Sequence, residues 1–148
     1  MRLASMLQGV LLLLVLAGCG RSDTAVVAHA SGEASPARIE AGRKLFARCA
    51  GCHEVGPKAG NIFGPHLNGV LGRQAGTVAG YAYSPALKAS MLVWDEAKLT
   101  AFIRDSEKVV PGNKMRFMSF LSDRQAGEIV AYLATQGGTE AGQGRPSP

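Results

Sequence analysis

Three side chains that could hold a cofactor lie within five residues of this 148-residue chain, in Cys49-Ala50-Gly51-Cys52-His53. Two thiols at this spacing can form thioether bonds to the two vinyl groups of a haem, and the turn that follows places His53 under the iron. The C-x-x-C-H spacing is typical of covalent haem attachment. The motif therefore predicts one covalent haem c bound by Cys49, Cys52 and His53.

Three other chemistries use paired cysteines, and the rest of the sequence gives each of them little support. A thioredoxin-type redox pair requires a βαβ context, which the sequence pattern does not predict. A zinc site requires a second pair of nitrogen or sulfur ligands, and only His66, in a loop, and His29, in a linker, remain. A local disulfide between Cys49 and Cys52 is the third alternative.

A haem with a single histidine ligand is open to other ligands, whereas a second strong ligand makes it an electron carrier. The methionines available are Met91, Met115 and Met118. Met115 ends the segment Val110-Pro111-Gly112-Asn113-Lys114-Met115, where proline and glycine favour an irregular loop. We interpret Met115 as the thioether ligand; the alternative is a buried residue that fills a gap in the core. Met118 would compete only if this loop repacked.

Residues 1–18 have the form of a secretory signal peptide, with Arg2, an apolar middle and small residues before Cys19. The apolar run is about 10 residues, half of the roughly 20 that a membrane-spanning helix needs, which argues against an uncleaved anchor. Leu16-Ala17-Gly18-Cys19 resembles the lipobox of bacterial lipoproteins, which implies cleavage before Cys19 and lipidation of its sulfur. A cleaved signal with a free thiol is the alternative.

The rest of the chain predicts one helical domain between flexible ends. Residues 19–36 would be the lipidated cysteine and a linker, and residues 138–148 a disordered tail. Within residues 37–137 we expect an all-α domain with long loops. Helix starts are predicted by Ser35-Pro36, Ser84-Pro85, Asp95 and the Ser122/Gln125 capping box. A Gly-rich loop is expected over residues 52–83.

The composition limits the class of partner. The formal net charge is +5, from 16 Lys and Arg against 11 Asp and Glu, and 6% of the residues are aromatic. A mildly basic domain favours acidic protein partners or an anionic membrane, and no basic run with interleaved aromatic residues indicates nucleic-acid binding.

Several motifs in one order resemble class I cytochrome c of the mitochondrial and alphaproteobacterial kind. The resemblance runs from about Ile39 to Thr135 without a sizeable gap. It implies the fold of that family, in which the N- and C-terminal helices cross and long loops surround one haem. The motifs are Cys49-Ala50-Gly51-Cys52-His53, Gly64-Pro65-His66-Leu67-Asn68-Gly69-Val70-Leu71-Gly72-Arg73, Gly80-Tyr81-Ala82-Tyr83-Ser84, Trp94 and Pro111-Gly112-Asn113-Lys114-Met115.

The resemblance also implies roles for the matching residues. His53 and Met115 would ligate the iron, and the Pro65 carbonyl would accept the second ring N–H of His53. The inner haem propionate would be hydrogen-bonded by Arg73, Tyr83 and Trp94. Phe117 would lie beside the exposed haem edge. At the helix crossing, Gly42 and Phe46 would meet Tyr132 and Leu133.

Some positions depart from the family pattern. Phe102 replaces a tyrosine near the methionine ligand and Leu87 replaces an asparagine, so we expect a drier pocket. Partner docking would use the cations around the haem edge, Arg48, Lys108, Lys114 and Arg116. Glu107, Leu121 and Ser122 stand where soluble relatives often carry lysine, so the docking face would be less basic than usual.

The resulting interpretation is a monomeric one-electron carrier on the periplasmic side, anchored to a membrane through Cys19. It would take electrons from a quinol-oxidising complex and give them to a terminal oxidase, or serve one dehydrogenase. The alternative from the enzyme class is a haem peroxidase or a ligand-binding sensor, which would need an open iron site and an acid–base group above it. No such group is obvious around Met115.

Overall fold

The computed structural model describes residues 34–137, and within them the expected all-α architecture is confirmed. The predicted signal peptide, Cys19, most of the linker and the tail lie outside the described residues. Among residues 34–137 the one extended pairing is an isolated antiparallel bridge between Gln74 and Val93. In this part of the chain, no helix has both the length and the apolar character needed to cross a bilayer.

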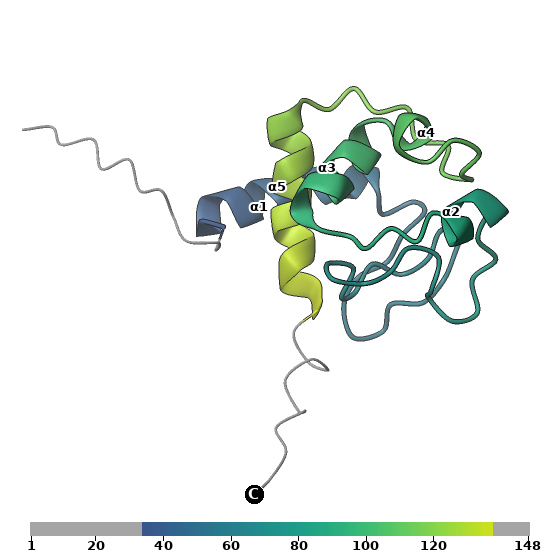
Figure 1. The fold of residues 1–148 in the computed structure, drawn as a ribbon. Helices are drawn as coiled ribbons and strands as arrows, with labels where there is room; N and C mark the ends of the chain where they lie inside the picture. The colour runs from purple at the N-terminus through teal and green to yellow at the C-terminus, as the bar shows by residue number, and fades with distance from the viewer. Residues whose placement is uncertain (1–33, 138–148) are drawn as a thin grey trace, which may run out of the picture. The chain divides into compact units, whose positions relative to one another are not determined.

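Within residues 34–137, five α-helices and two short 3-10 turns make up the regular structure (Figure 1). In chain order the elements are α1 (Pro36–Leu45), η1 (Phe46–Arg48), α2 (Pro85–Ala89), α3 (Glu96–Arg104), α4 (Ser106–Val109), α5 (Asp123–Ala134) and η2 (Thr135–Gly137). The long segment between η1 and α2 is irregular, as expected from its glycines and prolines.

The predicted N-terminal caps are present at the starts of α1, α2, α3 and α5. The Ser35, Ser84 and Asp95 side chains accept hydrogen bonds from the third residue of their helices. Ser122 and Gln125 form the reciprocal capping box of α5. These bonds satisfy backbone N–H groups that a helix leaves unpaired at its start, which is why they fix where each helix begins.

Helices α1 and α5 cross closely (Figure 1). A Cβ atom built on Gly42 would overlap the carbonyl group of Glu128, 2.5 Å from its carbon, so only glycine permits this approach. The Phe46 and Tyr132 rings lie 5.4 Å apart between centroids at the same crossing. The predicted meeting of Gly42 and Phe46 with Tyr132 is confirmed. Because Cys49 follows directly after η1, the crossing also fixes the start of the Cys-x-x-Cys-His segment.

The hydrophobic core connects this crossing to α3 and to the loops. Its members are mainly aliphatic and aromatic side chains from η1, α3, α5 and the loops between the helices. They include Phe46, Val70, Trp94, Leu99, Phe102, Ile103, Val110, Leu121, Ile129, Val130 and Leu133. Several of them also line a cavity, so the core and the site share one wall.

Candidate functional site

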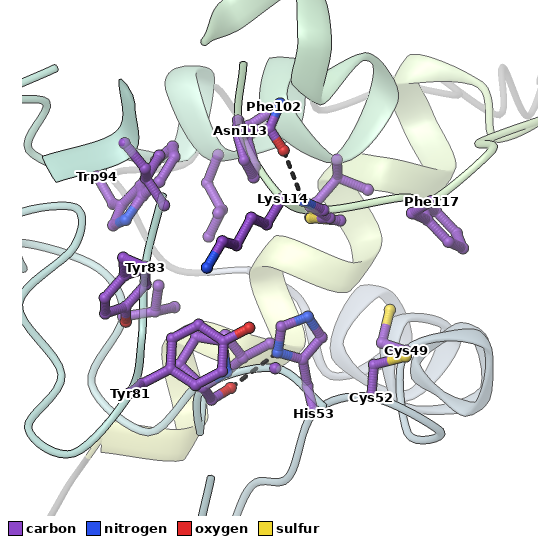
Figure 2. Close-up of a pocket in the computed structure, with 18 of the residues that line it drawn as sticks. Cys49, Cys52, His53, Tyr81, Tyr83, Trp94, Phe102, Asn113, Lys114 and Phe117 are labelled. Atoms are coloured by element: carbon purple, nitrogen blue, oxygen red, sulfur yellow. Dashed lines mark hydrogen bonds between the residues drawn. The ribbon is translucent and has the colours of Figure 1, made fainter. Parts of the chain in front are cut away.

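A cavity of about 330 Å³ lies between the loop that carries Cys49 to Leu67 and the segment that carries Met115. Figure 2 shows Cys49, Cys52 and His53 on one side of it, with Asn113 and Lys114 on the opposite side. Most of the lining is apolar, and it includes Leu67, Val70, Leu87, Trp94, Leu99, Phe102, Ile103, Phe117, Ile129 and Leu133. An apolar cavity of this size suits a large, mostly apolar ligand.

His53 is held by the loop that follows it. Its Nδ1 donates to the Pro65 carbonyl oxygen at 2.8 Å, which is the predicted hydrogen bond and leaves Nε2 as the acceptor (Figure 2). Gly64 packs against the ring, and a Cβ there would lie 2.6 Å from Nδ1. Burial lowers the pKa of His53, and the bond to Pro65 offsets part of that effect. A neutral imidazole with one free nitrogen is the form that ligates a metal.

The two cysteines line the cavity next to His53. Cys49 is half-buried, whereas Cys52 is more exposed. The amides of Cys52 and His53 donate to the Cys49 carbonyl at 3.0 and 2.9 Å, which closes the turn between them. Burial raises the pKa of the Cys49 thiol to about 11, with a further contribution from Cys52.

This environment argues against the other chemistries considered for the cysteine pair. A thioredoxin-type redox pair requires a βαβ context, and the described fold contains no βαβ unit. Residues 34–137 contain no group of three or more His, Cys, Asp or Glu side chains that could hold a metal ion such as zinc. His66 is not among the residues that line the cavity.

Met115 lines the same cavity as His53, from the other chain segment. Its backbone N–H donates to Asn113 Oδ1 at 2.7 Å, the upper dashed line in Figure 2. Asn113 is only 1% exposed, and its Nδ2 donates to the Val110 carbonyl at 2.9 Å. The sequence reasoning missed Asn113 as a site residue, although it lies in the Pro-Gly-Asn turn and asparagine often bonds backbone groups in turns.

Arg73, Tyr83 and Trp94 line one end of the cavity. Arg73 donates to the carbonyl oxygens of Asn68 at 2.7 Å and His66 at 3.2 Å, so its guanidinium is fixed in place. Burial lowers the pKa of Arg73. The Trp94 ring packs on Phe102 with centroids 4.9 Å apart. Their binding of a haem propionate stays a prediction.

Cations surround the cavity. All charged side chains of its lining are positive: Arg48, Arg73, Lys114 and Arg116. Lys114 Nζ donates to the Ala82 carbonyl at 3.0 Å and so joins the methionine segment, residues 110–120, to the loop before α2. Lys108, the fourth predicted docking residue, is exposed on α4 but is not among the lining residues.

One surface expectation needs correction. Leu121 is 3% exposed and belongs to the hydrophobic core, so it does not lie on the docking face. Ser122 is exposed and is also the N-cap of α5. The prediction of a less basic face therefore rests on Ser122 and on Glu107, which is exposed and lies 3.9 Å from Arg116.

Sequence reasoning also missed three exposed hydrophobic residues. Phe63, Met118 and Phe120 are 82%, 81% and 84% exposed. Phe63 lines the cavity, as Phe117 does, and the Tyr81 hydroxyl donates to the Phe63 carbonyl at 2.8 Å. No periodic pattern singles out such positions, because they lie in irregular loops.

The lining fits the haem that the motif predicts. It offers two thiols on adjacent turns, an imidazole oriented by a carbonyl, and a thioether from a separate segment. The apolar walls suit a porphyrin, and cations without any lining carboxylate suit its two propionates. Phe102 and Leu87, the two departures from the family pattern, both line the cavity and add to its apolar character.

Comparison with known proteins gives consistent matches. The family model described as "Cytochrome c" matches residues 39–137. Cytochrome c-550 of Nitrobacter winogradskyi is 45% identical over 96 residues, 65% of this chain and 88% of that relative. Cytochrome c2 of Rhodoblastus acidophilus is 47% identical over 95 residues, 64% of this chain and 89% of that relative. The structure of cytochrome cH from Methylobacterium extorquens superposes with a TM-score of 0.61 at 44% identity, covering 66% of this chain and 97% of that one.

Proposed function

Because this chain belongs to the cytochrome c family, we propose that it carries single electrons on a haem bound through Cys49 and Cys52 and ligated by His53 and Met115. Family members carry one covalent haem c and are electron carriers rather than enzymes. The observation that supports the ligand assignment is that one apolar cavity receives both thiols, the oriented imidazole and the thioether.

The haem supplies the redox chemistry, because iron between an imidazole and a thioether exchanges one electron at a relatively high potential. The chain's residues set the conditions. Pro65 fixes the tautomer and direction of His53, and the apolar walls exclude water. Arg73, whose position is fixed by two backbone carbonyls, would balance the charge of a propionate, with Tyr83 and Trp94 beside it.

The enzyme alternative, a haem peroxidase or a ligand-binding sensor, has no support here. The relatives are electron carriers. Among the described residues, the lining contains no carboxylate that could act as a general acid or base near Met115. We therefore retain electron transfer.

We place the protein on the periplasmic side as a membrane-anchored monomer. The sequence supports this through the signal-like residues 1–18 and the lipobox that ends in Cys19. Its partners would be a quinol-oxidising complex and a terminal oxidase, or a dehydrogenase, which meet the haem edge near Phe117 and the cations Arg48, Lys108, Lys114 and Arg116. Such encounters are transient and bury little surface.

The ferric absorption spectrum of the purified protein tests the ligand assignment. We expect a low-spin spectrum with a sulfur-to-iron band in the near infrared, lost in Met115→Ala and retained in Met118→Ala, whose side chain is 81% exposed. A band that survives Met115→Ala would refute Met115 as the ligand. Intact mass of the mature protein measures the haem, the cleavage before Cys19 and the acyl chains together.

A further inference from the structure

The backbone of Met115 is held at both ends by side chains. Its N–H donates to Asn113 Oδ1 at 2.7 Å, and its carbonyl accepts from Ser106 Oγ at 3.1 Å. Ser106 is 7% exposed and Asn113 1%, so the side chain in each of these bonds is buried. Breaking a hydrogen bond to a buried side chain leaves that side chain unsatisfied away from water, which costs free energy.

Helix α4, which carries Ser106, also fixes the turn before Met115. Gly112 N donates to Glu107 Oε1 at 2.9 Å, and Glu107 is the neighbour of Ser106 in α4. Gly112 has φ of +79°, a conformation that favours glycine and reverses the chain at this point. Two consecutive residues of α4, Ser106 and Glu107, therefore hold Met115 and the turn that precedes it.

The sulfur of Met115, in contrast, is unsupported. Within residues 34–137 it accepts no hydrogen bond, although the Met91 sulfur accepts one from Gln74 in the same structure. Phe102 stands where the family pattern has a tyrosine near the methionine ligand, and phenylalanine has no hydroxyl to donate. Apart from its packing against the core, the direction of the Met115 side chain therefore depends on how its backbone is held.

From these contacts we infer that Ser106, Glu107 and Asn113 form a clamp that positions Met115 through its backbone and keeps its sulfur in the cavity. Ser106 and Glu107 are positioning residues, since they act through Met115 and the turn rather than on the cofactor. This inference rests on the proposed ligation by Met115. The clamp closes α4 onto the methionine segment, and the segment must leave α4 before another ligand can replace the sulfur.

Imidazole binding to the ferric holoprotein tests the clamp, because imidazole replaces the methionine and so measures release of the segment. Ser106→Ala removes the bond to the Met115 carbonyl, which exists only while the segment is in place. We expect imidazole to bind about fivefold more tightly, the equivalent of about 1 kcal/mol for one buried neutral hydrogen bond. The near-infrared sulfur band should weaken at a correspondingly lower imidazole concentration.

The matched control is Ser119→Ala. Ser119 lies in the same segment, and its hydroxyl accepts a hydrogen bond from Leu121 N at 3.3 Å without touching Met115. Imidazole affinity in this variant should equal that of the unmodified protein. Equal affinities in Ser106→Ala and Ser119→Ala would overturn the inference.

Glu107 gives a second test from an exposed residue, which also applies if Ser106→Ala yields no holoprotein. Glu107→Gln and Glu107→Ala both remove the charge, but only glutamine keeps an acceptor for Gly112 N–H. We expect imidazole to bind Glu107→Ala two- to fivefold more tightly than Glu107→Gln, about 0.4–1 kcal/mol at 1.4 kcal/mol per factor of ten. Equal affinities would contradict the clamp.

Failure of the clamp is distinguishable from failure of the ligand assignment. If the unmodified ferric protein has no sulfur band, Met115 ligation itself is wrong and the clamp falls with it. If the band is present and disappears in Met115→Ala, but the Ser106 and Glu107 variants behave like their controls, only the clamp is wrong.

Discussion

Replacing Gly64 by alanine should disturb His53 without touching a thiol or the methionine. A Cβ on Gly64 would lie 2.6 Å from His53 Nδ1 and closer still to Cε1, whereas real Cβ contacts essentially never fall below 3.0 Å. The ring must therefore move by at least 0.4 Å at Nδ1, the difference between 3.0 and 2.6 Å. That nitrogen donates to Pro65 at 2.8 Å, so the shift lengthens or bends the hydrogen bond.

A weaker bond to Pro65 makes the imidazole a poorer donor to iron, which disfavours the ferric state and raises the reduction potential. We take the hydrogen-bond free energy lost in the ferric state to exceed that lost in the ferrous state by about 0.5–1 kcal/mol. At 59 mV per 1.4 kcal/mol for one electron, the reduction potential then rises by roughly 20–40 mV. Overpacking should also lower the free energy of unfolding by about 1–3 kcal/mol.

The assay is a spectroelectrochemical titration of the purified holoprotein, with Gly51→Ala as control. A Cβ on Gly51 meets nothing within 4 Å, although Gly51 lies inside the cysteine motif. We expect the control to match the unmodified protein. A Gly64→Ala potential equal to that of Gly51→Ala would refute the packing argument, and a lower potential would refute its sign.

Three further predictions concern the helix crossing, the docking face and the sequence around Cys19. Gly42→Ala should lower the free energy of unfolding in urea by about 2 kcal/mol or more, because its Cβ meets rigid backbone of α5. Gly127→Ala, with only the end of an arginine side chain at 3.3 Å, should be neutral or stabilising by up to about 1 kcal/mol. Arg48→Glu should slow reduction by an acidic redox protein several-fold at low salt, whereas Lys88→Glu, equal in charge change but absent from the cavity lining, should not. Cys19→Ser should give a mature mass without acyl chains and shift the protein to the soluble fraction; an unchanged membrane fraction would contradict the proposed anchor.

The sequence predicted the features that depend on neighbouring residues. Ser35, Ser84, Asp95 and the Ser122/Gln125 pair cap helices through bonds that span three residues, and such local bonds can be read from the sequence. The C-x-x-C-H turn is local in the same way.

Tertiary contacts were predicted only through the resemblance, as with His53 and Pro65, and others were missed. Helix α4 has four residues, too few to give a helical period, and Asp105 caps it while also ending α3. The bond from Ser106 to Met115 joins residues nine apart through a loop whose path the sequence does not specify. Leu121 was misjudged because its position was compared with surface lysines, whereas here the chain enters α5 with this side chain in the core.

The cations at the cavity differ in their access to water, and this separates two properties of the carrier. Arg73 is fixed inside by two carbonyls, where dissolved ions screen a charge weakly, whereas Arg48, Lys114 and Arg116 are exposed. Rising ionic strength should therefore loosen encounters with acidic proteins while leaving the driving force for electron transfer nearly constant. The rate of electron transfer between proteins can then change with the salt concentration, while the reduction potential is set by the buried residues and stays nearly the same.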